Sequence, residues 1–319
     1  RGKKSVVEMV TVLMAKQGDA NIENAKGVTP LRVALEKSVA KPVIQSLLES
    51  KAEVDYITHS GATLLHAACM KNDKGKLAKA VLAMKCDVNV KHRETQATAL
   101  HYAAAPPGVA DLIPQLCQAG AEVDARDEHG CTPLHQALQA GCEPAIHLLL
   151  SAKADVNAHG EVAGAEVATL ELAIRKCRNL ELVRILIELG ADVNRRSEED
   201  GATPLLHAAA EGDGDLIRVL VAEGAELAVT NRSGQSPLDV AMEKGHDVVV
   251  TMLRCMDVHA SARNGDVSLL QVALEHGADP NSVHPKSGAT PLCAAAQKGN
   301  LEILGILLSH NADPNMTPA

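Results

Sequence analysis

The residues best suited to chemistry in this chain are its histidines, of which there are 14. Three of them, His66, His101 and His135, occupy the fourth place of a recurring phrase that begins with threonine. An imidazole can ligate a metal or act as a general base, but either role needs further ligands or a carboxylate at a suitable spacing. No HxxxH or HExxH spacing occurs in the sequence, so the pattern predicts structural histidines and no metal site.

A group of carboxylates offers a second candidate site. Glu211, Asp213 and Asp215 alternate with glycine, as the ligands of a calcium loop do. Such a loop needs an acidic ligand at its twelfth position. Counting from Glu211 gives Ala222 there, and counting from Asp213 gives Gly224. The group is therefore predicted to be a turn between two helices, with Asp215 near a helix N-terminus that favours its charge.

The eight cysteines do not form a recognisable site either. No two lie within five residues of each other, so no CxxC pair exists. We expect reduced cysteines packed as small hydrophobic residues, which favours the cytoplasm or the nucleus. Phosphate-binding GxGxxG and Walker phrases and the GxSxG phrase are also missing from the sequence. The sequence thus predicts no catalytic, cofactor-binding or metal-ligating residues, and no enzymatic activity.

Charge and aromatic content argue against two classes of partner. The 319 residues include 31 Lys and Arg against 40 Asp and Glu, a net charge of -9 that gives no attraction for nucleic-acid phosphates. With 2 Tyr, no Phe and no Trp, the chain cannot build a base-stacking platform. No apolar run approaches the roughly 18 residues that span a bilayer, so we expect no direct membrane insertion.

The elements that must position these residues recur along the chain. Frames with the same order of residues start at Thr29, Thr63, Thr98, Thr132, Ala168, Thr203, Ser236, Met256 and Thr290. Successive starts are 34, 35, 34, 36, 35, 33, 20 and 34 residues apart. Frames close on a phrase such as Gly190-Ala191-Asp192-Val193-Asn194. A fixed period of this length is typical of repeat architectures.

Each frame has the residues of a helix pair. Thr132 suits a helix N-cap, and Pro133 suits the first helical position, where a missing N–H is harmless. Gly141 is predicted to end the first helix, and Gly190 and Gly224 to end the second helix of their frames. One such pair cannot bury its apolar face alone, so the frames must stack into a continuous core.

Thr132-Pro133-Leu134-His135 together with the Gly190–Asn194 close resembles the ankyrin repeat family over the whole chain. The resemblance implies a mainly α fold: a solenoid of paired antiparallel helices with β-hairpin loops, about nine frames plus an N-terminal half repeat. It also implies that His66, His101 and His135 hydrogen-bond to neighbouring backbone. Asparagines such as Asn194 would tie the hairpins in the same way.

The pattern breaks between the frames at Ser236 and Met256, which are only 20 residues apart. No turn cluster separates Asp247–Met256 from Asp257–Asn264, so we expect a direct helix-to-helix joint without a normal hairpin. The sequence predicts two blocks, 1–254 with the half repeat and the frames from 29 to 236, and 255–319 with the frames at 256 and 290. Because neither end carries a polar capping repeat, we expect part of a longer chain or of a larger complex.

The function must then lie in a surface. The resemblance implies a concave face built from hairpin tips and the exposed side of the first helices, where Tyr56 and Tyr102, the only rings of Phe, Tyr or Trp type, would act as binding residues. The candidate partner-binding residues are Tyr56, His59, Met70, Lys71, His92, Arg93, Tyr102, Glu128, His129, Gln136, Gln139, Arg175, Lys176, Glu198, Glu199 and Arg232.

The alternating charge of these residues favours a protein partner over a polyanion. We therefore interpret the chain as a protein–protein interaction scaffold or adaptor. Two alternatives stay open on the sequence: a regulatory or targeting region of a larger enzyme, and a structural subunit of a large assembly.

Overall fold

The computed structural model describes residues 19–25, 28–36, 41–70, 75–105, 109–162, 164–227, 229–275, 278–283 and 288–316. The expected half repeat before Asp19, the candidate Lys71 and the Pro106–Gly108 turn lie outside these residues. The chain forms two compact units, Arg1–Cys177 and Arg178–Ala319, called unit 1 and unit 2 below. The division after residue 254 that the spacing predicts stays a prediction.

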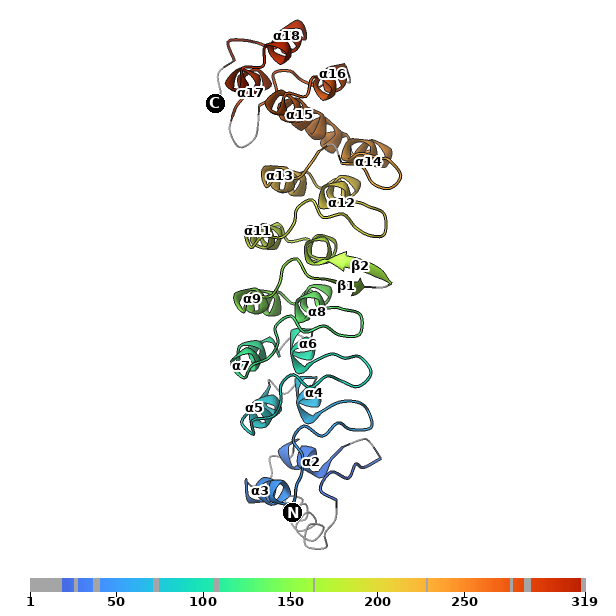
Figure 1. The fold of residues 1–319 in the computed structure, drawn as a ribbon, viewed down its shortest axis with the longest axis vertical. Coiled ribbons are helices and arrows are strands. Elements are labelled where there is room, and N and C mark those ends of the chain that lie inside the picture. Colours follow the sequence, from blue (N-terminus) through green and yellow to red (C-terminus); the bar gives the residue numbers. More distant parts are fainter. Residues whose placement is uncertain are drawn as a thin grey trace. The chain divides into compact units, whose positions relative to one another are not determined.

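Unit 1 is built from short helix pairs that follow one another in chain order (Figure 1). First helices α4, α6 and α8 line up beside one another, and second helices α5, α7 and α9 form a parallel row, with the connecting hairpins on the side of the first helices (Figure 1). The elements are α2 (Pro30–Glu36), α3 (Lys41–Glu49), α4 (Leu64–Cys69), α5 (Lys76–Leu82), α6 (Ala99–Ala104), η1 (Ala110–Leu112), α7 (Ile113–Gln118), α8 (Pro133–Ala140), α9 (Glu143–Ser151), β1 (His159–Val162), β2 (Ala165–Ala168), α10 (Thr169–Leu172) and the π-helical turn η2 (Ala173–Cys177).

Unit 2 contains α11 (Leu180–Glu188), α12 (Pro204–Glu211), α13 (Gly214–Ala222), α14 (Pro237–Lys244), α15 (Asp247–Asn264), α16 (Val267–Glu275), α17 (Pro291–Lys298) and α18 (Leu301–Ser309). Within it, α12 packs against α13 and α14, and α15 packs against α14, α16 and α17. No helix in the described ranges is long and apolar enough to cross a bilayer.

Helix starts and stops follow the local sequence. Thr132 is the N-cap of α8 in extended conformation, and Pro133 takes the first helical position, as predicted. Gly141 ends α8 with a φ of 62°, and Gly190 follows α11 with a φ of 95°. These left-handed conformations are open to glycine without a side-chain clash, which is why the helices stop there.

The core consists of aliphatic side chains and alanine. Ala103, Ala137 and Ala208 on first helices are fully buried, which lets neighbouring helices approach closely. Larger residues fill the space toward the second helices, and those without exposed surface include Leu100, Leu134, Leu138, Ile146 and Leu149. Burying each such side chain contributes roughly 1.5–3 kcal/mol, so a core can form without Phe or Trp.

The frame at Ala168 departs from the pattern because its threonine comes one residue late. β1 and β2 pair as an antiparallel hairpin in which Gly160 faces Val167. Gly160 passes so close to the preceding hairpin that a Cβ would lie 2.7 Å from the Cys131 Cα. Thr169 Oγ1 donates to the Ala158 carbonyl at 3.1 Å and ties the new helix to the base of its hairpin.

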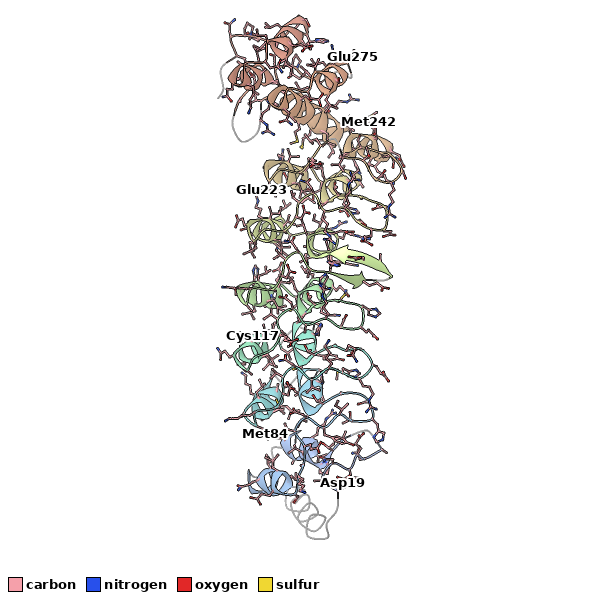
Figure 2. All side chains as sticks on the ribbon, viewed as in Figure 1. Asp19, Met84, Cys117, Glu223, Met242 and Glu275 are labelled. Carbon is pink, nitrogen blue, oxygen red and sulfur yellow. The ribbon has the colours of Figure 1, made fainter. Side chains whose placement is uncertain are left out.

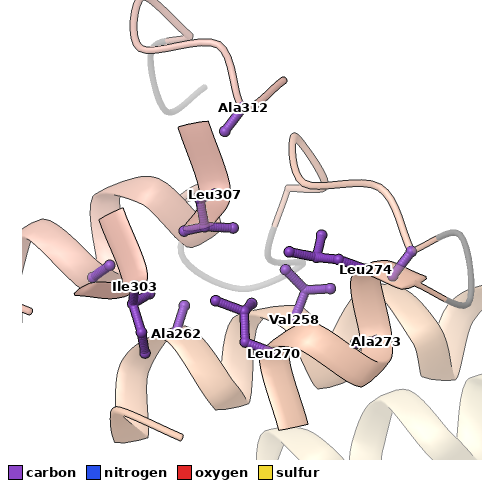
Figure 3. Close-up of a cluster of buried hydrophobic side chains, with 10 residues drawn as sticks. Val258, Ala262, Leu270, Ala273, Leu274, Ile303, Leu307 and Ala312 are labelled. Carbon is purple, nitrogen blue, oxygen red and sulfur yellow. The ribbon is translucent and has the colours of Figure 1, made fainter. Parts of the chain in front are cut away.

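The second departure lies between the frames at Ser236 and Met256, whose starts are only 20 residues apart. One helix, α15, runs without interruption from Asp247 to Asn264 through the place where a hairpin is missing (Figure 1). Its second half joins a separate hydrophobic cluster with α16, α17 and α18 (Figure 3). Val258, Leu270, Ile303 and Leu307 in that cluster are completely buried. The same helix therefore serves as the second helix of one frame and the first helix of the next.

Candidate functional site

The three repeated histidines are structural, as predicted. The Thr63 N–H donates to His66 Nδ1 at 3.0 Å, and the far side of the ring, His66 Nε2, lies 3.1 Å from the Ala97 carbonyl of the next frame. His101 repeats the arrangement with Thr98 at 3.0 Å and the Cys131 carbonyl at 3.0 Å. Because Nδ1 accepts, Nε2 must carry the proton and donate it, which fixes the neutral ring.

The burial of these rings sets their charge. Burial lowers the pKa of His66 and of His135 to about 4, because a charged ring would lose its hydration. Burial also lowers the pKa of His101. All three rings are therefore uncharged at neutral pH. His66 and His101 join the first helices of neighbouring frames, whereas among the described residues His135 bonds only within its own frame, to Thr132.

Several pairs of neighbouring hairpins are joined by a backbone hydrogen bond. In unit 1 the Arg93 N–H donates to the Gly61 carbonyl at 2.9 Å, and the Glu128 N–H donates to the Thr95 carbonyl at 2.9 Å. In unit 2 the Arg232 N–H donates to the Asp200 carbonyl at 2.8 Å. These tips are therefore held in register with their neighbours.

Basic side chains at the start of the hairpins reinforce this ladder. Lys91 Nζ donates to the Arg126 carbonyl at 3.0 Å, and Arg126 Nη1 donates to the His159 carbonyl at 2.9 Å. In unit 2, Arg196 Nη1 donates to the Thr230 carbonyl at 2.9 Å. This role was not predicted from the sequence, although Lys91, Arg126 and Arg196 stand at equivalent places in their frames.

The asparagines that close the frames form a second set of ties. Asn89 Nδ2 donates to the Gly120 carbonyl at 2.9 Å, while Asn89 Oδ1 accepts from the Glu122 N–H at 2.9 Å. Asn194 makes the same pair of bonds in unit 2, with Gly224 at 3.0 Å and Glu226 at 2.8 Å. The predicted structural role of Asn194 is therefore confirmed.

Tyr102 lies on helix α6 and reaches Thr95 of the hairpin that precedes this helix. Its ring packs edge-on against His66 at a centroid distance of 5.5 Å and lies 6.2 Å from His92. Its hydroxyl is 3.3 Å from Thr95 Oγ1 in the hairpin. The side chain is half-buried, so one part packs and the rest faces outward.

Gln136 occupies the equivalent place one frame later. Its Nε2 donates to Asp127 Oδ2 in the adjoining hairpin at 3.2 Å. The helical and hairpin surfaces of unit 1 therefore meet at Tyr102 and Gln136 and form one continuous face, which we call the hairpin face.

Tyr56 and His59 lie around one carboxylate, that of the half-buried residue Glu23. His59 Nδ1 lies 2.8 Å from Glu23 Oε1, and the same oxygen accepts from the His59 N–H at 2.9 Å. Burial alone would raise the pKa of Glu23, but its hydrogen bonds with His59 outweigh that effect and lower the pKa. Burial and the nearby carboxylates of Glu23 and Asp19 raise the pKa of the Tyr56 hydroxyl. Glu23 was not predicted, because it lies 36 residues before His59.

His92 corrects the sequence-based expectation of an exposed tip. Only 9% of the residue is exposed, and its Nδ1 accepts from the N–H groups of Glu94 and Thr95 at 3.3 Å each. Asp127 and Asn231 take the equivalent place in other hairpins, and each accepts from backbone N–H groups of its own turn. This position closes the turn, so its side chain points inward.

The other candidates divide by unit. Unit 1 exposes His59, Met70, Arg93, Glu128, His129, Gln139, Arg175 and Lys176, and it half-buries Tyr56, Tyr102 and Gln136. Unit 2 exposes Glu198, Glu199 and Arg232. The partner-binding role of all these residues stays a prediction.

The acidic group at Glu211 is a turn between helices, as predicted. Asp213 is the N-cap of α13, and its Oδ1 accepts from the Leu216 N–H at 3.0 Å. Asp215 pairs with Arg218 one turn later. Within the described ranges, no group of three or more His, Cys, Asp and Glu side chains is placed to hold a metal ion.

The repeated helix pairs, capped by threonine and joined by histidine and asparagine, match a known family model. The model for ankyrin repeats in three copies matches residues 3–92, 65–159, 170–260 and 255–318. The chain belongs to the ankyrin-repeat family. Ankyrin repeats are generally protein–protein interaction modules, and the mainly helical repeat fold is the one that the resemblance implied, while the number of frames stays a prediction.

Several curated ankyrin-repeat proteins are similar to this chain. It is 31% identical to mouse ankyrin repeat and SOCS box protein 16 over 82% of its own length and 54% of the relative. The mouse B-cell lymphoma 3 protein homolog is 28% identical over 65% of this chain and 47% of the relative. Human Rabankyrin-5 is 29% identical over 88% of this chain and 25% of the relative. The chain thus spans about half the length of the first two and a quarter of the third.

Proposed function

We propose that the hairpin face of unit 1 binds a protein partner and that the chain acts as a scaffold or adaptor. The observation that carries this proposal is the continuity of the face. Tyr102 and Gln136 on first helices contact Thr95 and Asp127 of the hairpins, so side chains from both elements can meet one partner surface.

The hairpins are ordered before any partner arrives. Their tips are joined by backbone bonds such as Arg93 N–H to Gly61 and by Lys91 Nζ to the Arg126 carbonyl. Since binding then orders few additional groups, more of the contact energy is available for affinity. The mixed signs of Arg93, Glu128 and His129 favour a partner with a matching alternation of charge over a uniform polyanion.

The test is capture of partners by the full-length protein, read by quantitative mass spectrometry, with a charge-swapped variant of the face. Arg93→Glu with Glu128→Lys leaves the net charge unchanged and alters only exposed side chains. We expect a stoichiometric partner to be lost by about tenfold or more, because exposed complementary charges become repulsive.

The matched control is Lys79→Glu with Glu49→Lys, which swaps two exposed charges on second helices of unit 1. It should retain the partner. A partner that still binds the Arg93→Glu, Glu128→Lys variant but no longer binds the control variant would place the interface on the second helices and reject the proposal.

A further inference from the structure

Unit 2 contains a hollow that is separate from the hairpin face of unit 1 and is lined by helices and by the start of the hairpin at residues 224–227. It has a volume of about 610 Å³ and is lined by residues of α11, α13, α15 and α17. The second half of α15, which continues where other frames turn into a hairpin, supplies Met256, Ala260 and Arg263 to its wall. Figure 2 shows the side chains of α13 and α15 around this region, with Glu223 labelled after the end of α13.

The floor of the hollow is apolar. Ala222, Leu227, Ala260 and Ala294 are half-buried, and Met256 is 7% exposed. Apolar surface that stays partly open in a folded unit can be covered by apolar side chains of a ligand. A volume of this size is within the usual range of ligand-binding clefts.

The rim carries positive charge. Arg184 of α11, Arg218 of α13, Arg263 of α15 and Lys298 of α17 line the hollow and are exposed. Glu226 is the acidic residue of its lining. Arg218 pairs with Asp215, whereas Arg184, Arg263 and Lys298 have no carboxylate within ion-pair distance among the described residues.

This local charge opposes that of the chain, whose net charge is -9. A cleft with cations at its rim and low-dielectric walls attracts a negatively charged ligand despite an acidic surround. The cations stand on four separate helices around one hollow, which favours a ligand that carries several negative charges. A flat bilayer surface would meet the rim but not enter the hollow.

We propose that this hollow docks an acidic amphipathic peptide segment of a protein partner. Apolar side chains of the segment lie on Met256, Ala260 and Leu227, and its carboxylates lie at Arg184, Arg263 and Lys298. The site is separate from the hairpin face, and it gives the chain a second docking surface within unit 2.

The probe for the test is a fluorescein-labelled dodecapeptide with leucines at helical spacing and Asp or Glu at all other positions. Its counterpart has the same leucines with Asn and Gln in place of the acids. Fluorescence anisotropy with the full chain should give a Kd about tenfold lower for the acidic probe, and the difference should shrink with added salt.

Two variants assign the binding to the hollow. Arg184→Glu with Arg263→Glu should raise the Kd of the acidic probe by about tenfold or more. Ala260→Trp, which fills the floor, should weaken both probes. The control Arg232→Glu with Lys244→Glu changes the net charge equally on exposed residues of unit 2 outside the hollow, and it should leave the Kd within about twofold, because solvent screens distant surface charges.

Equal binding of the two probes, or a Kd that the Arg184 and Arg263 reversals leave unchanged, overturns the proposal. Vesicles that contain phosphatidylserine provide a further arm. If they bind the chain through Arg184 and Arg263 while the acidic probe does not, the hollow serves a membrane surface and the peptide proposal is rejected. The hairpin variant Arg93→Glu with Glu128→Lys should not change probe binding, so failure of either proposal leaves the other testable.

Discussion

Helix α8 in unit 1 and helix α14 in unit 2 begin with the same N-terminal motif but use different residues to complete it. In α8 the third helical residue is His135, and in α14 it is Asp239. Both side chains accept the N–H of the capping residue, at 3.2 Å for Thr132 and 2.8 Å for Ser236. The caps are therefore locally equivalent.

The difference lies in what the side chain can do beyond its own helix. In the same place, His66 and His101 reach carbonyls 31 and 30 residues away, whereas Asp239 has no second group to donate. In unit 2, histidine links between frames come from other positions, such as His246 to the Ala210 carbonyl at 3.1 Å. A histidine in the cap can thus couple the start of a helix to the stacking of frames, as in α4 and α6, and an aspartate cannot.

The largest difference between the two kinds of cap is expected at low pH, which should destabilise the helices capped by histidine. His66 and His135 have pKa values of about 4 in the folded chain, below the ordinary value of about 6.5. The unfolded state binds more protons between these values, so stability falls as pH drops from about 6.5 toward 4. From pH 7 to 5 each ring should lower the free energy of unfolding by about 2 kcal/mol, and the two rings together by about 4 kcal/mol.

Hydrogen exchange of the full chain, followed by mass spectrometry at both pH values, would resolve this loss by region. We expect α4 and α8 to lose more protection than α14, after correction for intrinsic exchange rates. Equal losses in all three helices would contradict the link between the histidine cap and acid sensitivity.

Removing one histidine should have the next largest effect. His101→Ala leaves the Thr98 N–H without its acceptor and the Cys131 carbonyl without its donor, both in buried surroundings. We expect the free energy of unfolding of unit 1 to fall by about 3 kcal/mol. Urea titration followed by circular dichroism would measure it, and a loss below about 1 kcal/mol would show that water replaces the ring.

Removal of the aspartate cap should lower the free energy of unfolding by less than removal of the histidine. Asp239→Ala removes the acceptor for the exposed Ser236 N–H and breaks no bond between frames. The expected cost is about 1 kcal/mol, in the range of ordinary helix caps. The same urea titration measures it, and a loss as large as that of His101→Ala would mean that Asp239 also supports stacking.

The smallest effect is expected at a position where the frames of this chain already differ in residue type. Asp55 and Asp124 accept from the Asp87 and Asp155 N–H groups, at 3.0 and 2.8 Å, in the place that Asn89 fills elsewhere. Asn89→Asp keeps the bond from Glu122 and loses the donor to Gly120. Because the site is exposed, we expect a loss of about 0.5 kcal/mol by thermal unfolding, and a loss above about 2 kcal/mol would reject this equivalence.

Features that depend on a few neighbouring residues could be predicted from the sequence. The Thr132 cap, Pro133 at the start of α8 and Gly141 at its end need only local geometry. The family pattern then supplied the solenoid fold and the structural role of His66 and His101.

Features that depend on how frames sit beside one another could not be predicted. The carboxylate of Glu23 meets His59 only after two frames have stacked. His92 was expected at the surface, yet its ring closes a turn and packs near Tyr102. The hollow in unit 2 is lined by Arg263 of the continuous helix α15 together with residues of α13 and α17, which are distant in the sequence.

That continuous helix has a mechanical consequence. In a stack of separate helix pairs, a chain stretched from its ends can release one pair at a time, each with its own step in length. α15 belongs to the frames at Ser236 and Met256 together, from Asp247 to Asn264, and half of it cannot leave without exposing the other half. Under tension in an optical trap, these two frames should extend as a single long step.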